Sequence, residues 1–204
     1  MVEICYSFSM KDLNQHYSLL LGLDESWIVE DVDLDLSSNQ VVIRLSHAGG
    51  RLVCAECGQS CSQADRAPQR TWRHLDTMQF KTEIKAAVPR GDCKQCGVKT
   101  IAVPWAGKHS RFTLMFEALA IRVLQACANV SKAAGLLGLG WDAVHSIIER
   151  AVARGLDRRS LDNIKHVGMD EKSFGKGHDY VSIITDIDNR RVLEVTPERT
   201  TEAA

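Results

Sequence analysis

The sequence lacks the features that direct a protein into or across a membrane. Its first ten residues contain no basic segment followed by an apolar core, so we expect no signal peptide. No apolar run approaches the roughly 18 residues of a membrane span, so we expect no membrane partner. Of 204 residues, 45% are apolar and 25% are charged, which is typical of a soluble globular protein. The expected compartment is the cytoplasm.

The sequence also has little net charge, −1, but this value conceals an uneven distribution. Residues 1–47 have a net charge of −6, and residues 166–204 have a net charge of −3. Residues 48–103 and 104–165 each carry nine basic and five acidic side chains, which gives +4 for each segment. A basic middle between acidic ends is more typical of a nucleic-acid-binding protein than of a metabolic enzyme. We take these four segments as the expected domains.

The seven cysteines are an odd number, and four of them form two Cys-x-x-Cys pairs. The paired cysteines are Cys54, Cys57, Cys93 and Cys96. Without export signals, such pairs favour a metal site over disulfides. Each pair places two thiolates on one tight turn, and Gly58 and Gly97 after them tolerate positive φ. Two such knuckles supply the four ligands of a tetrahedral zinc ion. Cys61 could replace a ligand, although its spacing favours a spectator thiol.

Alternating and helical patterns predict how the first half of the chain folds. Residues 10–23 have helical apolar spacing behind Ser9, a candidate N-cap. Residues 27–36 and 41–45 alternate around a turn and predict a β-hairpin. The 35 residues between the cysteine pairs include an alternating run, residues 80–88. We therefore expect a zinc ribbon whose connecting arm is a β-excursion.

The third segment has the pattern of a helix-turn-helix unit. Its first helix starts at Thr113 and has an apolar face formed by Phe112, Met115, Phe116, Leu119, Val123 and Cys127. Ser131 is the expected cap of a short helix, 132–137, and a glycine-containing turn leads to a third helix, 141–155. The inward positions of that helix are Val144, Ile147, Ile148, Ala151 and Val152. This layout is typical of helix-turn-helix proteins, and the alternative is a helical dimerisation hairpin.

A helix-turn-helix unit implies a set of DNA contacts. Asp142, His145 and Ser146 at the start of the third helix are expected to face base edges. Phosphates need only positive charge, which Lys132, Arg150 and Arg154 supply. Three tryptophans could stack on bases, but tryptophans of small domains usually belong to the core; they are Trp72, Trp105 and Trp141. His74 is interpreted as structural or as a phosphate contact.

The last segment returns to a strand pattern. A strand over 165–171 ends in Asp170-Glu171, and β-rich runs at 180–185 and 191–195 follow, joined by the turn at 186–189. Three such strands, with the acidic residue on the first, are the opening of a ribonuclease H-like sheet. Asp186 is a weaker candidate acid, because turn chemistry explains it adequately.

The combined motifs resemble the ISL-three family of bacterial insertion-sequence transposases. The resemblance runs from about Trp27 to Arg199. It rests on Cys-x-x-Cys-Gly, Arg-Thr-Trp-Arg-His-Leu-Asp (70–76), Val88-Pro89-Arg90, Val103-Pro104-Trp105-Ala106, Gly168-Met169-Asp170-Glu171 and Lys176-Gly177-His178-x-Tyr180. It implies an α+β multidomain fold with a four-cysteine zinc ribbon, a helix-turn-helix bundle and a ribonuclease H-like nuclease domain. Its partner is then double-stranded DNA at terminal inverted repeats, with self-association as a further possibility.

The resemblance also implies a catalytic role for one residue. Asp170 matches the first acid of the family's Asp-Asp-Glu triad, whose carboxylates hold two Mg²⁺ ions for phosphoryl transfer. Family transposases are about twice as long, so we expect a truncated N-terminal fragment that binds DNA but cannot cut it alone. The alternative is a zinc-containing helix-turn-helix transcriptional regulator, because one acid by itself does not establish an enzyme.

Overall fold

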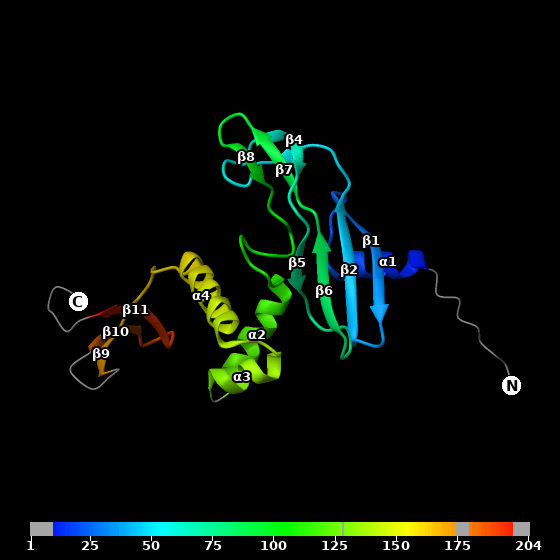
Figure 1. Cartoon of the computed structure of the whole chain (residues 1–204). Helices are drawn as coiled ribbons and strands as arrows, with labels where there is room; N and C mark the ends of the chain where they lie inside the picture. The colour runs from blue at the N-terminus through cyan, green and yellow to red at the C-terminus, as the bar shows by residue number, and fades with distance from the viewer. Residues whose placement is uncertain (1–9, 128, 174–179, 198–204) are drawn as a thin grey trace. The chain divides into compact units, whose positions relative to one another are not determined.

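The computed structural model describes residues 10–127, 129–173 and 180–197 (Figure 1). The chain divides into two compact units, one that reaches to Val152 and one that begins at Ala153. The elements are α1 (Met10–Leu20), β1 (Trp27–Asp35), β2 (Gln40–His47), β3 (Leu52–Val53), β4 (Ser60–Arg66), β5 (Arg70–Arg73), β6 (Lys81–Ala86), β7 (Pro89–Cys93), β8 (Gly97–Thr100), α2 (Leu114–Ala126), α3 (Val130–Leu137), α4 (Trp141–Arg158), β9 (Val167–Ser173), β10 (Tyr180–Asp186) and β11 (Arg191–Pro197). Among these helices, none has the length and apolarity needed to cross a membrane. The candidate N-cap Ser9 lies outside the described residues.

The first sheet has the strand order β1-β2-β6-β5. Strands β1 and β2 pair antiparallel, so the predicted hairpin is confirmed. Strand β6 pairs parallel with β2 and antiparallel with β5. A parallel pair needs a long crossover, and residues 48–80 provide it. The sequence predicted a domain boundary between residues 47 and 48. The sheet crosses this boundary, because β1 and β2 precede it and β5 and β6 follow it.

The core of the first sheet is built around three tryptophans. The Trp105 ring packs edge-to-face against Trp27, with centroids 4.6 Å apart, and against Trp72, with centroids 5.5 Å apart. Edge-to-face packing places the positive edge of one ring on the negative face of another. Helix α1 adds Tyr17 to this cluster. The prediction that Trp72 and Trp105 belong to the core is confirmed.

The second sheet has the order β3-β4-β7-β8 and forms the ribbon. Its central strands β4 and β7 pair antiparallel. The first cysteine pair lies in the loop between β3 and β4, and the second lies at the turn between β7 and β8. The arm between the pairs leaves this sheet, enters the first sheet as β5 and β6, and returns as β7. The predicted β-excursion is thus confirmed.

Helices α2, α3 and α4 follow as the sequence predicts, with one correction in each of them. Helix α3 begins at Val130, and Asn129 rather than Ser131 caps it, because the Asn129 Oδ1 accepts a hydrogen bond from the backbone N–H of Lys132 at 2.9 Å. The predicted inward position Val152 is exposed, since the buried stripe of α4 consists of Val144 and Ile147.

The buried face of α2 also differs from the prediction. Met115 and Leu119 are exposed, whereas Phe116 and Ala120 are buried and belong to a cluster with Leu137 and Ile147. The buried set includes one acidic residue, Glu117. The apolar stripe is therefore rotated from the expected one, because a buried carboxylate occupies part of the inner face.

The second unit contains a three-stranded antiparallel sheet with the order β11-β10-β9. The three predicted strands are confirmed, and each extends one or two residues beyond its expected end. Asp186 at the end of β10 is fully buried. It accepts hydrogen bonds from the backbone N–H and the side-chain amide of Asn189 and from Arg191 Nε. The interpretation of Asp186 as a turn residue is confirmed.

Candidate metal centre and nucleic-acid interface

The first knuckle is closed by backbone hydrogen bonds around its cysteine pair. The N–H of Gly58 donates to the carbonyl of Cys54 at 3.0 Å, and the N–H of Cys54 donates to the carbonyl of Gln59 at 2.8 Å. Gly58 has φ +72°, and Gly97 in the second knuckle has φ +71°. Both values lie in the left-handed region, which a glycine adopts without steric cost. The glycines after each pair therefore have the role that the sequence indicated.

The two knuckles bring four sulfur atoms together. The Sγ atoms of Cys54, Cys57, Cys93 and Cys96 all lie within 4.8 Å of one another. The Sγ atoms of Cys57 and Cys93 are 3.6 Å apart, and none of the four is in a disulfide. A zinc ion with tetrahedral Zn–S bonds of about 2.3 Å separates its sulfurs by about 3.8 Å. The cluster therefore has the ligand number and the approximate sulfur spacing of a tetrahedral zinc site.

The thiols of the cluster have unequal acidity. Hydrogen bonds from the backbone N–H groups of Cys57 and Glu56 lower the pKa of Cys54 to about 7. A hydrogen bond to the Cys57 sulfur and desolvation raise the pKa of Cys96 to about 12. Crowded thiolates repel one another, so they cannot all ionise together without a cation. A divalent ion among them removes that repulsion.

Cys61 lies beside this cluster but outside it. It is buried on β4, and its thiol points to the backbone carbonyl of Leu52 at 3.7 Å. Burial raises the pKa of Cys61, which keeps the thiol protonated. Gly91 on β7 faces its Sγ so closely that any Cβ at residue 91 would overlap the sulfur. This packing supports the interpretation of Cys61 as a spectator thiol.

The motif Arg-Thr-Trp-Arg-His-Leu-Asp begins on β5, continues past the end of this strand, and connects the first sheet to α2. The backbone N–H of Thr113 donates to the carbonyl of Arg73 at 3.0 Å, and the Arg73 guanidinium lies over the Phe116 ring. A 3.0 Å hydrogen bond joins His74 Nδ1 to Thr113 Oγ1, which also caps α2. Burial lowers the pKa of His74 to about 4, so the ring is neutral at physiological pH. The burial of His74 and its hydrogen bond to the cap of α2 support the structural interpretation of this residue.

The predicted base-reading positions lie at the surface of α4. Asp142 and His145 are exposed, and Ser146 is half-buried. The neighbouring Trp141 is 57% exposed and stacks on the His145 ring with centroids 4.9 Å apart. The expectation that Trp141 belongs to the core is wrong, because it occupies the first turn of the helix on its outer side. Lys132 is exposed on α3.

Arg150, a predicted phosphate contact, forms an ion pair within the helical unit. Its Nε donates to Glu117 Oε1 at 2.8 Å, and Glu117 is fully buried on α2. The hydroxyl of Ser110 donates to the same oxygen at 2.8 Å. Arg150 is therefore already paired across two helices, since a buried carboxylate requires a positive partner. Arg154 lies half-buried one turn further along α4. Sequence reasoning missed Glu117, because an acidic residue in an amphipathic helix is ordinarily expected to face solvent.

Asp170 occupies the middle of β9 in the second unit and is exposed. It pairs in register with Ile183 of β10, and its Oδ1 accepts a hydrogen bond from the backbone N–H of Glu171 at 2.9 Å. Its carboxylate is thus accessible at the surface of the sheet. Among the described residues, Asp170 does not belong to any group of three or more side chains that could hold a metal ion.

Three family models match successive parts of the chain. Residues 51–96 match the zinc-finger of transposase IS204/IS1001/IS1096/IS1165. Residues 101–152 match the helix-turn-helix domain of transposase family ISL3, and residues 167–204 match the transposase domain of the same family. The chain belongs to transposase family ISL3.

Two curated transposases are similar to most of the chain. The transposase for insertion sequence element IS1557 of Mycobacterium tuberculosis is 29% identical over 190 residues, which cover 89% of this chain and 42% of the relative. The transposase for insertion sequence element IS1001 of Bordetella parapertussis is 27% identical over 154 residues, which cover 75% of this chain and 38% of the relative. The chain thus spans less than half the length of these relatives. No solved structure matches it.

The ISL3 matches coincide with the elements described above. The zinc-finger match contains the first three cluster cysteines and ends at the fourth, Cys96. The helix-turn-helix match covers α2, α3 and the part of α4 that contains Trp141 and Arg150. The transposase-domain match begins at Val167, the first residue of β9. Each matched region of this ISL3 chain therefore corresponds to a structural element that carries candidate functional residues.

Proposed function

We propose that this chain binds duplex DNA, and that within a whole ISL3 transposase it recognises the terminal inverted repeats of an insertion sequence. The observation that carries the proposal is the four-cysteine cluster, followed along the chain by a three-helix unit that the helix-turn-helix model matches. Both regions have an excess of basic side chains. Because that proposed substrate is chromosomal DNA, we place the action of the protein in the cytoplasm.

Zinc has a structural role in this proposal. The four thiolates of the cluster would hold one ion, which supplies a cross-link between two loops rather than a reactive centre. The cluster joins the β3–β4 loop to the β7–β8 turn, and few apolar residues besides Leu52 and Ile101 pack around it. A small sheet with so little core depends on a metal for its fold.

The helices supply the proposed sequence-reading surface. The N-terminal part of α4 carries Trp141 and His145, which are exposed and stacked on each other. A recognition helix reads base edges with residues from its N-terminal part, and an exposed aromatic ring can contact a thymine methyl group. Lys132 on α3 and Arg154 on α4 are the proposed phosphate contacts. Arg150 is not among them, because its guanidinium neutralises Glu117.

Asp170 is proposed as one acid of the nuclease centre of the whole transposase. Its carboxylate is exposed on a central position of β9, as required for a group that receives metal and substrate. The three strands would form the start of a ribonuclease H-like sheet. Mg²⁺ bound there by several carboxylates would activate the attacking oxygen and stabilise the leaving oxygen in phosphoryl transfer. In a full-length family member, replacement of the aspartate aligned with Asp170 by asparagine is expected to abolish strand cleavage and leave DNA binding intact.

The DNA-binding proposal is tested by fluorescence anisotropy with the zinc-loaded chain. One duplex carries the end of an ISL3-family element, and the control duplex has the same composition in shuffled order. We expect tighter binding to the first duplex and a logarithm of affinity that falls linearly with the logarithm of salt concentration. Trp141→Ala is expected to reduce the discrimination between the duplexes and to leave zinc content unchanged. An absence of binding at low salt would refute the proposal.

A further inference from the structure

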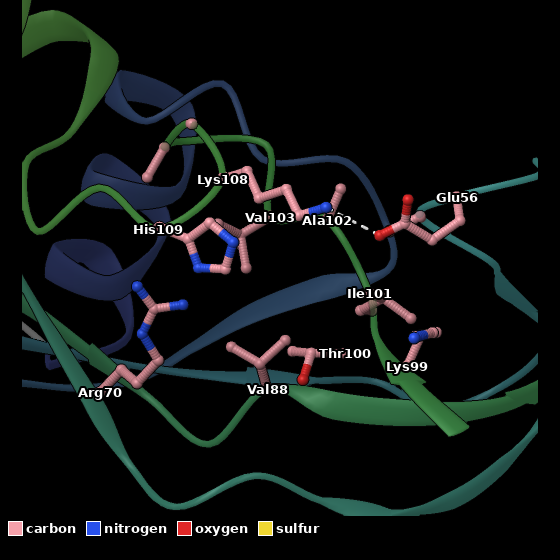
Figure 2. A pocket seen from close by; sticks show the side chains of 13 residues that line it. Glu56, Arg70, Val88, Lys99, Thr100, Ile101, Ala102, Val103, Lys108 and His109 are labelled. Atoms are coloured by element: carbon pink, nitrogen blue, oxygen red, sulfur yellow. Dashed lines mark hydrogen bonds and ion pairs between the residues drawn. The ribbon is translucent and has the colours of Figure 1, made fainter. Parts of the chain in front are cut away.

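A cavity of about 480 Å³ lies between the ribbon and the segment that leads to α2 (Figure 2). Its volume is within the range of about 300–1,000 Å³ that is usual for ligand sites. Its walls come from the first cysteine knuckle, strand β8 and residues 101–109. A hydrogen bond from the backbone N–H of Ile101 to the carbonyl of Pro89, 3.2 Å long, attaches one wall to the ribbon. None of the DNA contacts proposed above lies in this cavity.

Positive charge gathers around the cavity from three parts of the chain. Arg70 comes from β5, Lys99 from β8, and Lys108 from the segment before α2. Figure 2 shows the Arg70 guanidinium facing the His109 ring, and Lys108 reaching across to Glu56. Glu56 is the single carboxylate of the lining, so three permanent positive charges face one negative charge. The electrostatic character of the cavity therefore favours an anion.

The two lysines remain accessible to a ligand. The Lys108 side chain is 67% exposed and forms its ion pair with Glu56 at 2.8 Å. An exposed pair of this kind contributes little to stability, so a competing anion can displace Glu56 at small cost. Lys99 is exposed on β8. Arg70 is held in place, because its Nη2 donates to the carbonyl of Ser110 at 3.0 Å and its guanidinium lies over Trp72.

The rest of the lining indicates which kind of anion fits. The floor consists of small or aliphatic residues: Ala55, Val88, Ile101, Ala102, Val103 and Ala106. The lining contains no asparagine or glutamine, the side chains that pair with adenine, and no phenylalanine, tyrosine or tryptophan on which a base would stack. Thr100 adds a hydroxyl that can donate to a phosphate oxygen. The cationic and hydroxyl groups suit a phosphodiester, and the aliphatic floor suits the apolar face of its sugar. The lining therefore favours the DNA backbone over the bases.

We infer that this cavity holds the backbone of a duplex DNA strand, with phosphate oxygens bound by Lys99, Lys108 and Arg70. The cavity contains residues from both the zinc-finger match and the helix-turn-helix match, so a strand seated here runs from one module to the other. When no DNA is bound, the Lys108 ammonium group forms its ion pair with Glu56. This inference rests on the proposed DNA binding and adds a contact site that fixes position without reading sequence.

The test removes the two accessible charges from the full chain. The double variant Lys99→Ala with Lys108→Ala is titrated with the terminal-repeat duplex and the shuffled duplex at several salt concentrations. We expect equal weakening on both duplexes and a salt slope smaller by up to about 2, since each lost phosphate contact removes about 0.9. The double variant Lys99→Arg with Lys108→Arg is expected to restore binding, because it keeps both charges.

A matched control loses the same charge elsewhere. Lys81 and Lys85 lie on β6, and their side chains point to the opposite face of the sheet from Ala86, the partner of Arg70 in register. Lys81→Ala with Lys85→Ala is expected to leave the salt slope unchanged. Glu56→Gln is expected to strengthen binding several-fold, because it releases Lys108. Zinc content close to one ion per chain in every variant will establish that the ribbon is folded.

The results of these titrations distinguish a phosphate-binding cavity from the alternative explanations. If the Lys99→Ala, Lys108→Ala variant weakens duplex binding no more than the Lys81→Ala, Lys85→Ala control does, the inference about the cavity is overturned. The proposed DNA binding by the chain would survive that result. Weakening confined to the terminal-repeat duplex would overturn the inference as well, because it would assign sequence reading to the cavity. Displacement of DNA by a free mononucleotide at constant ionic strength would identify a nucleotide site instead. If the unaltered chain binds neither duplex, the proposed function itself fails.

Discussion

The contact between Arg150 and Glu117 gives the sharpest test of how the helices are assembled. The variant Arg150→Met keeps much of the side-chain length and removes the charge that faces the buried carboxylate. Removal of one partner from a buried ion pair costs about 3–5 kcal/mol, because the other charge stays uncompensated. Arg150 is partly exposed and Ser110 still donates to Glu117, so we expect the lower end, about 3 kcal/mol.

Urea denaturation followed by far-ultraviolet circular dichroism measures this loss in zinc-containing buffer. The double variant Arg150→Met with Glu117→Leu is expected to recover most of the stability, since neither charge is then buried alone. Arg122 is exposed on α2, and Arg122→Met is expected to change the free energy of unfolding by no more than about 0.5 kcal/mol. If Arg150→Met unfolds at the wild-type midpoint but loses DNA affinity, Arg150 is a phosphate contact and our assignment is wrong.

Two further predictions concern buried contacts. His74 has a pKa of about 4 when folded and about 6.5 when unfolded, so the unfolded state binds more protons between these values and stability falls as the pH is lowered through that window. The stability advantage of the wild type over His74→Gln should therefore shrink by about 1 kcal/mol from about pH 7.5 to about pH 5.5, and a constant difference would contradict the buried neutral ring. Gly91→Ala should destabilise the ribbon by about 1–3 kcal/mol through overlap with Cys61. In a Cys61→Ala background, Gly91→Ala should cost less stability, because the sulfur is gone. An equal loss of unfolding free energy in both backgrounds would show that another contact is responsible.

Local patterns were sufficient to predict most elements of this chain. The hairpin 27–47, the two knuckles and the three helices follow from periodicity, glycine positions and cysteine spacing, which are properties of neighbouring residues. The cap of α3 was misplaced by two residues, because Asn129 and Ser131 are both good N-caps and only the backbone geometry distinguishes them.

Long-range contacts could not be predicted from the same patterns. The parallel pairing of β2 with β6 depends on the path of a chain segment that passes through the ribbon, and no local pattern encodes that path. The burial of Glu117 depends on Arg150, 33 positions away, and on Ser110. The cavity beside Glu56 likewise arises only when the ribbon and residues 101–109 fold against each other. The four-cysteine cluster was predictable because the Cys-x-x-Cys spacing is itself typical of a metal site, whereas no sequence pattern indicates the cationic cavity.

The most direct test of the account is the metal content of the cluster. Cobalt(II) exchanged into the purified chain should give the intense visible absorption of a tetrahedral thiolate complex at about one ion per chain, and zinc should displace it. Cys93→Ser should weaken this absorption and the binding of duplex DNA together. A chain that binds no cobalt or zinc, with its four thiols free, would contradict the account.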